Sequence, residues 1–246
     1  MPMTQKSQRR PGLLASVADL AEVELALSCA DLIDLKDPAQ GALGAWPPAR
    51  IGEAVRLVAG RKPVSATVGD LPPVADILGA AAIATAAEGV DIVKLGFFAG
   101  GDHRALASAL TPVAARGVAL VAVLMADQDP DLGLVTGLAT AGFRGVMLDT
   151  ADKSAGGLLD HQAPARLARF VATAHAHGLL TGLAGSLRLS DIATLAPIGP
   201  DFLGFRGALC ERGRTASLAP ERLAAVRAAI DANRPRPAGL PGDVGR

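Results

Sequence analysis

Eight short runs of apolar and β-branched residues alternate along this chain with longer segments rich in Ala, Leu, Glu and Arg. The runs expected to form strands cover residues 13–17, 32–36, 64–68, 92–95, 118–124, 145–148, 179–184 and 202–205. The segments expected to form helices cover residues 18–29, 48–59, 73–87, 103–115, 131–141, 164–177, 190–196 and 220–232. Strict alternation of strand and helix indicates an α/β fold with a parallel sheet. Eight such units favour a closed (β/α)8 barrel, or TIM barrel, over an open doubly wound sheet.

The chain length of 246 residues is close to that of one such barrel. We expect a single catalytic domain over residues 12–232, a flexible N-terminal extension over 1–11 and a Pro/Gly-rich tail over 233–246. The first strand-to-helix turn, residues 16–19, lacks the glycine fingerprint of a dinucleotide site. This absence argues against the alternative interpretation, a Rossmann fold.

Two kinds of residue mark the expected helix boundaries. Prolines fall at expected first turns, at Pro48, Pro73, Pro164 and Pro220. Glycines follow expected helix ends, at Gly60, Gly89, Gly117, Gly142 and Gly178.

The formal net charge is zero, which argues against binding to nucleic acid or to an anionic membrane. Cys29 and Cys210 have no metal-ligand spacing and are expected to be reduced, largely buried thiols. The apolar runs are too short for a signal peptide or a membrane span. We therefore expect a cytoplasmic protein, and we expect it to form a homo-oligomer.

Polar residues at the ends of the expected strands are the candidates for chemistry, because barrel active sites lie there. Side chains alternate along a strand, so Asp34 and Lys36 share one face while Ile33 and Leu35 share the other. If the apolar pair packs on the helices, the charged pair points into the barrel. Two charged side chains inside a barrel are costly to bury unless they are fully paired or take part in the function. The alternative is a buried Asp34–Lys36 ion pair that only fills the barrel.

Lys94 ends an otherwise apolar run and can project into the same mouth as Lys36. Two ammonium groups in one pocket repel, and repulsion and burial both lower lysine pKa values from about 10.4. A neutral amine is the nucleophile needed for attack on a carbonyl. A surface lysine that extends to solvent is the alternative interpretation of Lys94.

Three further groups follow later strands. Asp149 closes the sixth strand, and Lys153 follows on a loop that contains glycines. The loops after the seventh and eighth strands often bind phosphate in this fold. Small residues there let backbone N–H groups approach an anion, and an arginine can add bidentate contacts. The candidate phosphate-binding residues are Gly185, Ser186, Gly204, Arg206 and Gly207.

Three segments, 30–45, 91–96 and 149–153, together with the opening Gly12-Leu-Leu-Ala-Ser-Val, resemble the (5-formylfuran-3-yl)methyl phosphate synthases. This family is also called 4-(hydroxymethyl)-2-furancarboxaldehyde-phosphate synthase. The resemblance covers nearly the whole barrel, and its most specific part is the motif from Asp34 to Gly44.

The resemblance implies a lyase that condenses two molecules of glyceraldehyde 3-phosphate to a phosphorylated furan aldehyde, with loss of phosphate and water. The product would serve methanofuran biosynthesis or related one-carbon carriers. Carried over by position, Lys36 would form the Schiff base and Lys94 would transfer protons. Asp34, Asp149 and Lys153 match the other charged active-site positions. The scheme needs no metal and no other cofactor, and its partners are the triose phosphates alone.

Two other functions stay open at the level of sequence. One is a different class I aldolase that uses the same lysines on another sugar phosphate. The other is a barrel that binds a phosphorylated metabolite without turnover and regulates a partner. Such a binding protein would tolerate Lys36→Arg.

Overall fold

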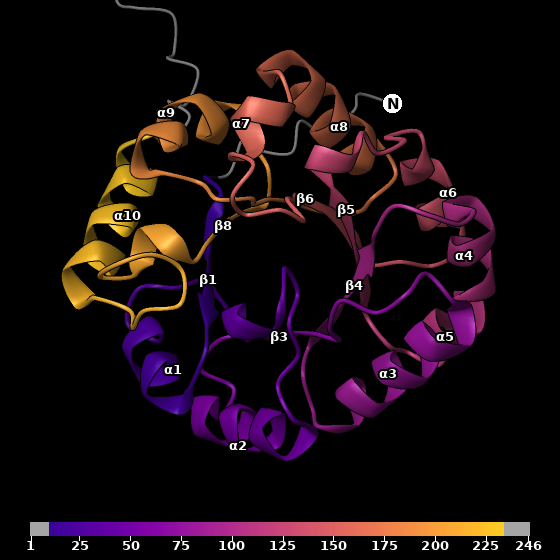
Figure 1. The fold of residues 1–246 in the computed structure, drawn as a ribbon, viewed down its shortest axis with the longest axis horizontal. Coiled ribbons are helices and arrows are strands. Elements are labelled where there is room, and N and C mark those ends of the chain that lie inside the picture. The colour runs from indigo at the N-terminus through magenta and orange to yellow at the C-terminus, as the bar shows by residue number, and fades with distance from the viewer. Residues whose placement is uncertain (1–9, 234–246) are drawn as a thin grey trace, which may run out of the picture.

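The computed structural model describes residues 10–233 and shows a closed barrel of eight parallel strands. Figure 1 looks along the barrel and shows the strands as a central ring inside a ring of helices. The strands are β1 (Gly12–Val17), β2 (Leu32–Leu35), β3 (Val64–Thr67), β4 (Ile92–Phe97), β5 (Leu120–Met125), β6 (Gly145–Asp149), β7 (Leu180–Leu183) and β8 (Phe202–Phe205). Each strand pairs with its neighbours in sequence, and β8 pairs with β1 to close the ring. The predicted fold class is confirmed.

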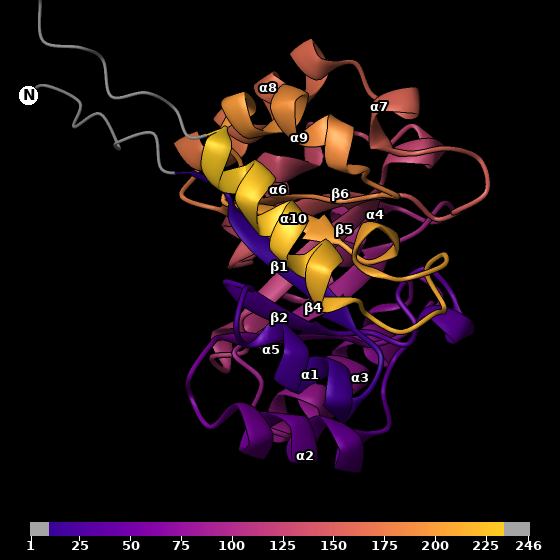
Figure 2. The same cartoon turned by 90° about the vertical axis from the view of Figure 1, so that its left-hand side faces the viewer.

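Helices cover the outside of the barrel. The α-helices are α1 (Leu20–Ala26), α2 (Pro48–Val58), α3 (Ala75–Ala87), α4 (His103–Ala109), α5 (Thr111–Ala115), α6 (Leu134–Thr140), α7 (Leu158–His161), α8 (Pro164–Ala176), α9 (Ile192–Leu195) and α10 (Pro220–Ala232). Short 3-10 turns are η1 (Pro38–Gln40), η2 (Ala126–Gln128), η3 (Leu189–Asp191), η4 (Ala196–Ile198) and η5 (Gly207–Leu209). Figure 2 turns the barrel on its side and shows α10 in front of β1 and running along it.

Three expected helices differ from the observed ones, and the one expected over 190–196 is a short α-helix, α9, between the 3-10 turns η3 and η4. The segment 103–115 forms two helices, because Pro112 in the first turn of α5 has no N–H to continue the ladder of α4. Helix α3 begins at Ala75, so Pro73 precedes the helix and does not lie in its first turn. Helix α7 was not predicted. The five glycines expected after helices all have positive φ, as residues that end helices do.

Three aspartates close the amino-terminal end of the barrel. Each comes directly before a strand and accepts a hydrogen bond from a backbone N–H of a neighbouring strand or its start. Asp31 binds Leu13 N, and Asp91 binds Val64 N. Asp201 accepts from Thr181 N in the same way, and all three N···O distances are 2.8 Å. These carboxylates satisfy N–H groups at the end of the barrel away from the candidate site.

The apolar core has two parts. The larger part lies between the sheet and the helices and includes Ile33, Leu35 and Leu95. The smaller part fills the inside of the barrel and includes Leu14, Val121 and Met147. The polar side chains described below therefore lie on an apolar floor of the barrel interior.

Other sequence predictions have mixed outcomes. The extension and tail fall largely on residues 1–9 and 234–246, which lie outside the described residues. Cys29 and Cys210 are both free, and burial raises the pKa of the Cys210 thiol. In the described range, every helix is too short or too polar to cross a bilayer.

Candidate active site

A cavity of about 610 Å³ opens at the carboxyl end of the strands. That volume is typical of pockets for small molecules. Lys36, Lys94, Asp149 and Lys153 line its inner part, and the loops after β7 and β8 form its outer wall. Site residues predicted on or after five separate strands, β2, β4, β6, β7 and β8, therefore meet at one place.

Asp34 lies behind Ser16 and Lys94, two residues that line this cavity, and is fully buried. Strand register places Ser16 of β1 and Ser65 of β3 on either side of it. Ser16 Oγ donates to Asp34 Oδ2 over 2.8 Å, and Ser65 Oγ donates to Asp34 Oδ1 over 2.7 Å. Burial alone would raise the pKa of Asp34, but the ammonium groups of Lys94 and Lys36 and the hydrogen bond from Ser65 lower it. Asp34 is thus held as a carboxylate.

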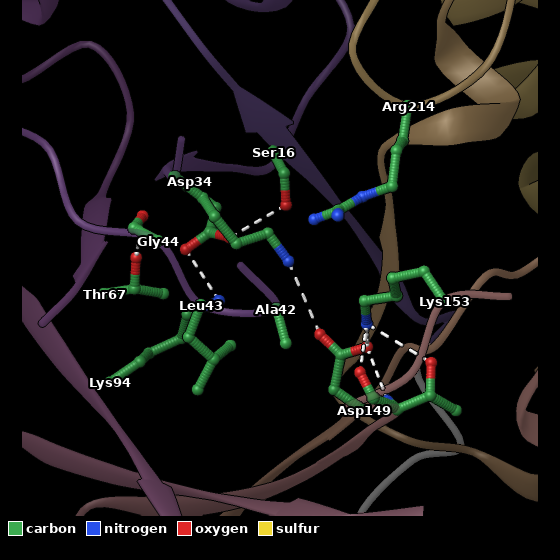
Figure 3. A network of polar contacts seen from close by, with 12 residues as sticks. Ser16, Asp34, Ala42, Leu43, Gly44, Thr67, Lys94, Asp149, Lys153 and Arg214 are labelled. Carbon is green, nitrogen blue, oxygen red and sulfur yellow. Dashed lines mark hydrogen bonds and ion pairs between the residues drawn. The ribbon is translucent and has the colours of Figure 1, made fainter. Parts of the chain in front are cut away.

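Lys94 is the direct ionic partner of Asp34, with Nζ 2.7 Å from Oδ1 (Figure 3). Strand β4 continues to Phe97, so Lys94 lies within the strand and deeper in the barrel than a terminal residue. Burial lowers the pKa of Lys94, and repulsion from Lys36 adds to this effect, whereas Asp34 opposes it. A buried lysine in this setting can give up its proton more readily than one in water.

Asp149, the last residue of β6, lies between two lysines. Its Oδ2 is 3.4 Å from Lys36 Nζ. Its Oδ1 accepts a hydrogen bond from Lys153 Nζ, as Figure 3 shows. Thr150 N also donates to Oδ1, over 2.8 Å. Burial opposes ionisation, but Lys153 and Lys36 hold the pKa of Asp149 well below its ordinary value. Burial also lowers the pKa of Lys153, with a further contribution from Lys36.

The ion pairs differ from the one considered from the sequence. Among residues 10–233, Asp34 pairs with Lys94, and Lys36 pairs with Asp149. The alternative interpretation, a buried Asp34–Lys36 ion pair that only fills the barrel, is therefore wrong, because each of these residues pairs with a different partner. The arrangement is two lysine–carboxylate pairs whose lysines line one cavity.

The loop after β2 holds the motif that the sequence singled out. Asp70 accepts hydrogen bonds from Ala42 N and Leu43 N, at 2.8 and 2.7 Å. A Cβ on Gly41 would lie 2.1 Å from Asp70 Oδ2, and one on Gly44 would lie 2.2 Å from a backbone oxygen. Both glycines are therefore required for the loop to fold against the end of the barrel.

The candidate phosphate-binding residues all line the cavity. Gly185 and Ser186 have φ of 106° and 47°, so this turn has left-handed backbone geometry. At Gly204 and Gly207 no side chain covers the backbone of β8 and the residues after it, so this backbone is exposed to the cavity. Backbone N–H groups in such turns can approach an anion closely.

Arg206 does not fit the expected role of a phosphate ligand. Its guanidinium donates to both carboxylate oxygens of Glu22 and to the carbonyls of Ser16, Arg214 and Ala216. These contacts use the five N–H groups of an arginine. In this arrangement Arg206 has no donor left for a phosphate.

Sequence reasoning missed several residues that the structure brings to the site, among them Ser16, which lines the cavity and donates to Asp34. Ser65 lies opposite Asp34 in the β2–β3 register, and the alternation within 64–68 could have indicated its inward direction. Glu22 lies on α1, where an acidic residue in a first turn is ordinary, and no local pattern marks it as buried. Arg214 lies on the loop before α10 and lines the cavity. No pattern in the sequence of this loop indicated that Arg214 belongs to the site.

In the part of the chain that the structure describes, no group of three or more His, Cys, Asp or Glu side chains is arranged to hold a metal ion. The polar groups that line the cavity among the described residues are lysines, arginines, the carboxylate of Asp149, two serines and backbone N–H groups. A closed barrel with paired lysines and carboxylates at the carboxyl end of its strands is the architecture of a barrel enzyme.

Comparison with known proteins identifies the family. The family described as 4-HFC-P synthase matches residues 13–227, and the chain belongs to it. A Methylorubrum extorquens relative, provisionally named (5-formylfuran-3-yl)methyl phosphate synthase, is 48% identical over 206 residues, covering 83% of this chain and 84% of the relative. The (5-formylfuran-3-yl)methyl phosphate synthase of Methanopyrus kandleri is 37% identical over 218 residues, covering 83% and 91%. The family predicted from the sequence is confirmed, and the chain is an enzyme.

Solved structures show the same fold at lower identity. The 3-keto-L-gulonate-6-phosphate decarboxylase of Vibrio cholerae superposes with a TM-score of 0.64 at 15% identity, covering 92% of this chain and 100% of that one. The 3-hexulose-6-phosphate synthase of Salmonella typhimurium has a TM-score of 0.64 at 14% identity, covering 90% and 99%. At these identities the likeness concerns the barrel alone.

Proposed function

We propose that this enzyme condenses two molecules of glyceraldehyde 3-phosphate to 4-(hydroxymethyl)-2-furancarboxaldehyde phosphate through a Schiff base on Lys36. The observation that carries the proposal is that Lys36 and Lys94 line one cavity, each beside its own carboxylate. The names of the relatives support the same product. Loss of one phosphate and two waters balances the reaction, so it needs no oxidant or reductant.

The first step is imine formation. The amine of Lys36, after loss of its proton, attacks the carbonyl carbon of one triose phosphate, and water leaves as the iminium forms. Asp149, 3.4 Å from Lys36 Nζ, is placed to stabilise the resulting cation. The bound iminium then withdraws electrons from the neighbouring carbon.

Lys94 is suited to the proton transfer that follows. Its pKa is lowered by burial, so its neutral form is accessible as a base for the acidified C–H bond. Asp34 stabilises the ammonium group that Lys94 becomes. The enamine so formed attacks the aldehyde of the second triose phosphate and makes the new carbon–carbon bond.

The later steps are dehydration, ring closure and phosphate loss. Lys153 and Asp149 form a hydrogen-bonded pair on the cavity wall, which supports a role for them in moving these protons. The turns at Gly185–Ser186 and Gly204–Gly207 would hold phosphate through backbone N–H groups. We further expect the enzyme to work as a homo-oligomer in the cytoplasm.

Borohydride trapping tests the proposal. Incubation with glyceraldehyde 3-phosphate and borohydride is expected to leave a triose phosphate adduct on Lys36, located by peptide mass spectrometry. The Lys36→Ala variant should keep its circular dichroism spectrum but form no adduct and no ultraviolet-absorbing furan. An adduct on Lys94 would reverse the two lysine roles. Absence of any adduct in the wild-type enzyme, together with absence of the furan product, would overturn the proposal.

A further inference from the structure

The loop between η5 and α10, residues 210–219, folds back on itself beside the cavity. Cys210 and Leu218 form an antiparallel bridge, and Glu211 N donates to Ser217 O over 3.1 Å. Arg214 follows the positive-φ residue Gly213 at the far end of this hairpin-like loop. The cationic side chain of Arg214 therefore lies at the tip of this loop.

A buried ion pair fixes this loop to the barrel. Arg206, directly after β8, pairs with Glu22 of α1 and donates to the carbonyls of Arg214 and Ala216 within the loop. Glu22 accepts in addition from Leu218 N over 3.1 Å. Three backbone groups of the loop are thus held by one ion pair, so the position of the Arg214 side chain depends on it.

The guanidinium of Arg214 has a different set of partners from that of Arg206. Among the described residues it donates only to Gly41 O, over 2.9 Å, on the loop after β2. Figure 3 shows its side chain leaving the ribbon, with the guanidinium turned toward Ser16 and lying above Lys153 and Asp149 in this view. Arg214 is half-buried and lines the cavity. Most of its N–H groups are therefore available to a ligand beside the reactive lysines.

The charges around the cavity favour an anion. Seven lysine and arginine side chains line it, against one carboxylate, that of Asp149, in the described residues. Two more carboxylates, Asp34 and Glu22, pair with lining cations from behind. Seven cations less three carboxylates leave an excess of four positive charges when all groups are ionised, whereas the whole chain has a net charge of zero. Two phosphate monoesters carry about −1.5 to −2 each near pH 7.

We propose that Arg214 binds the phosphate group of the substrate that reacts at Lys36, and that the Glu22–Arg206 pair positions it through the loop 210–219. The proposal rests on the proposed function for the identity of the substrate, but phosphate binding by Arg214 can be measured without turnover. A planar guanidinium gives two parallel N–H donors to phosphate oxygens. Arg206 thereby acts through Arg214 and touches no substrate.

The test is calorimetric titration of inorganic phosphate into the full-length wild-type enzyme and three variants. Arg214→Ala is expected to weaken phosphate binding by about ten- to a hundredfold, the range for a hydrogen bond to a charged group. Arg214→Lys should recover part of the loss, because it keeps the charge without the paired donors. Arg212→Ala is the matched control, since Arg212 is exposed on the same loop and lies outside the cavity lining.

Substrate kinetics separate binding from positioning. With glyceraldehyde 3-phosphate, Arg214→Ala should raise KM more than it lowers kcat. Borohydride trapping of phosphate-free glyceraldehyde on Lys36 should be the same in wild-type and Arg214→Ala enzymes. Glu22→Gln should also weaken phosphate binding, but should add little further loss in the Arg214→Ala background, because both changes remove the same contact.

The outcomes distinguish this proposal from the proposed function. Equal phosphate affinity in wild-type and Arg214→Ala enzymes overturns the role of Arg214, whatever the enzyme does with glyceraldehyde 3-phosphate. Weaker phosphate binding without any furan formation in the wild type supports Arg214 and overturns the condensation. Additive losses in the Glu22→Gln and Arg214→Ala pair overturn the positioning role of Glu22 and Arg206.

Discussion

Lys94 Nζ lies 2.7 Å from Asp34 Oδ1, and neither side chain is more than 4% exposed. Each charge is therefore stabilised mainly by the other and by the serine hydroxyls on Asp34. Removal of one partner leaves a buried charge without compensation, whereas removal of both leaves a neutral site. The same pair that stabilises the base of the proposed mechanism thus makes the floor of the cavity sensitive to single substitutions.

The variant Asp34→Asn should lose about 3 kcal/mol of unfolding free energy, measured by urea denaturation, because it leaves the Lys94 ammonium buried and unpaired. It should also lose turnover, because Lys94, the proposed base, would have no counter-ion once it is protonated. The double variant Asp34→Asn/Lys94→Met should be more stable than the sum of its single losses predicts. Additive losses would mean that the pair is not coupled in the folded state.

Gly41→Ala is expected to disturb the loop after β2. Its φ is 117°, and an added Cβ would displace the Asp70 carboxylate from the N–H groups of Ala42 and Leu43. We expect a loss of about 2–4 kcal/mol, from left-handed strain and two broken hydrogen bonds together. Gly60→Ala is the control, because its φ is 70° but no atom lies within 4 Å of the added Cβ. Equal losses in the two variants would show that the Asp70 contact contributes nothing.

Much of this fold could be predicted from local patterns. Each expected strand overlaps an observed one, and glycines mark helix ends at positions such as Gly89 and Gly178. The inward direction of Asp34 follows from alternation along β2. These features depend on a few neighbouring residues, which the sequence displays directly.

The pairing of charges could not be predicted in the same way. Whether Asp34 meets Lys36 or Lys94 depends on the stagger of β2 against β4 around the closed ring, and that stagger is a property of the whole barrel. Arg206 looked like a phosphate ligand because its partner Glu22 lies 184 residues away in the sequence. Long-range partners of this kind leave no local pattern, so both the role of Arg206 and the presence of Arg214 needed the structure.

The buried pair between Glu22 and Arg206 leads to a stability prediction of its own. Glu22→Gln should lower the unfolding free energy by about 3 kcal/mol, since Arg206 would lose its counter-ion while its side chain stays buried. In this variant, the backbone amides of residues 210–219 should exchange with deuterium faster than in the wild type, whereas exchange in β4 serves as the reference. Glu24→Gln on the exposed face of the same helix should change neither measurement. Unchanged exchange in the Glu22→Gln loop would contradict its attachment through this ion pair.

The decrease in unfolding free energy at acidic pH should depend on Asp149. Its pKa is lowered in the folded state relative to its ordinary value of 3.8, chiefly because Lys153 and Lys36 outweigh the effect of burial. A carboxylate with a lowered folded pKa stabilises the fold fully above its unfolded pKa. That contribution is lost as pH falls toward the folded value, because the unfolded chain binds the proton first. The wild-type unfolding free energy should therefore decrease as pH falls below about 5.

Asp149→Asn removes one of the groups responsible for this decrease and leaves Asp34, whose pKa is also lowered. The variant is less stable than the wild type at neutral pH, because Lys36 and Lys153 lose their shared partner. Its unfolding free energy should nevertheless fall less steeply between about pH 5 and pH 3, so the two curves converge as the pH decreases. Urea denaturation at half-unit pH intervals measures both curves. Parallel curves would mean that Asp149 titrates alike in the folded and unfolded chains, and that its two lysine partners do not hold it ionised.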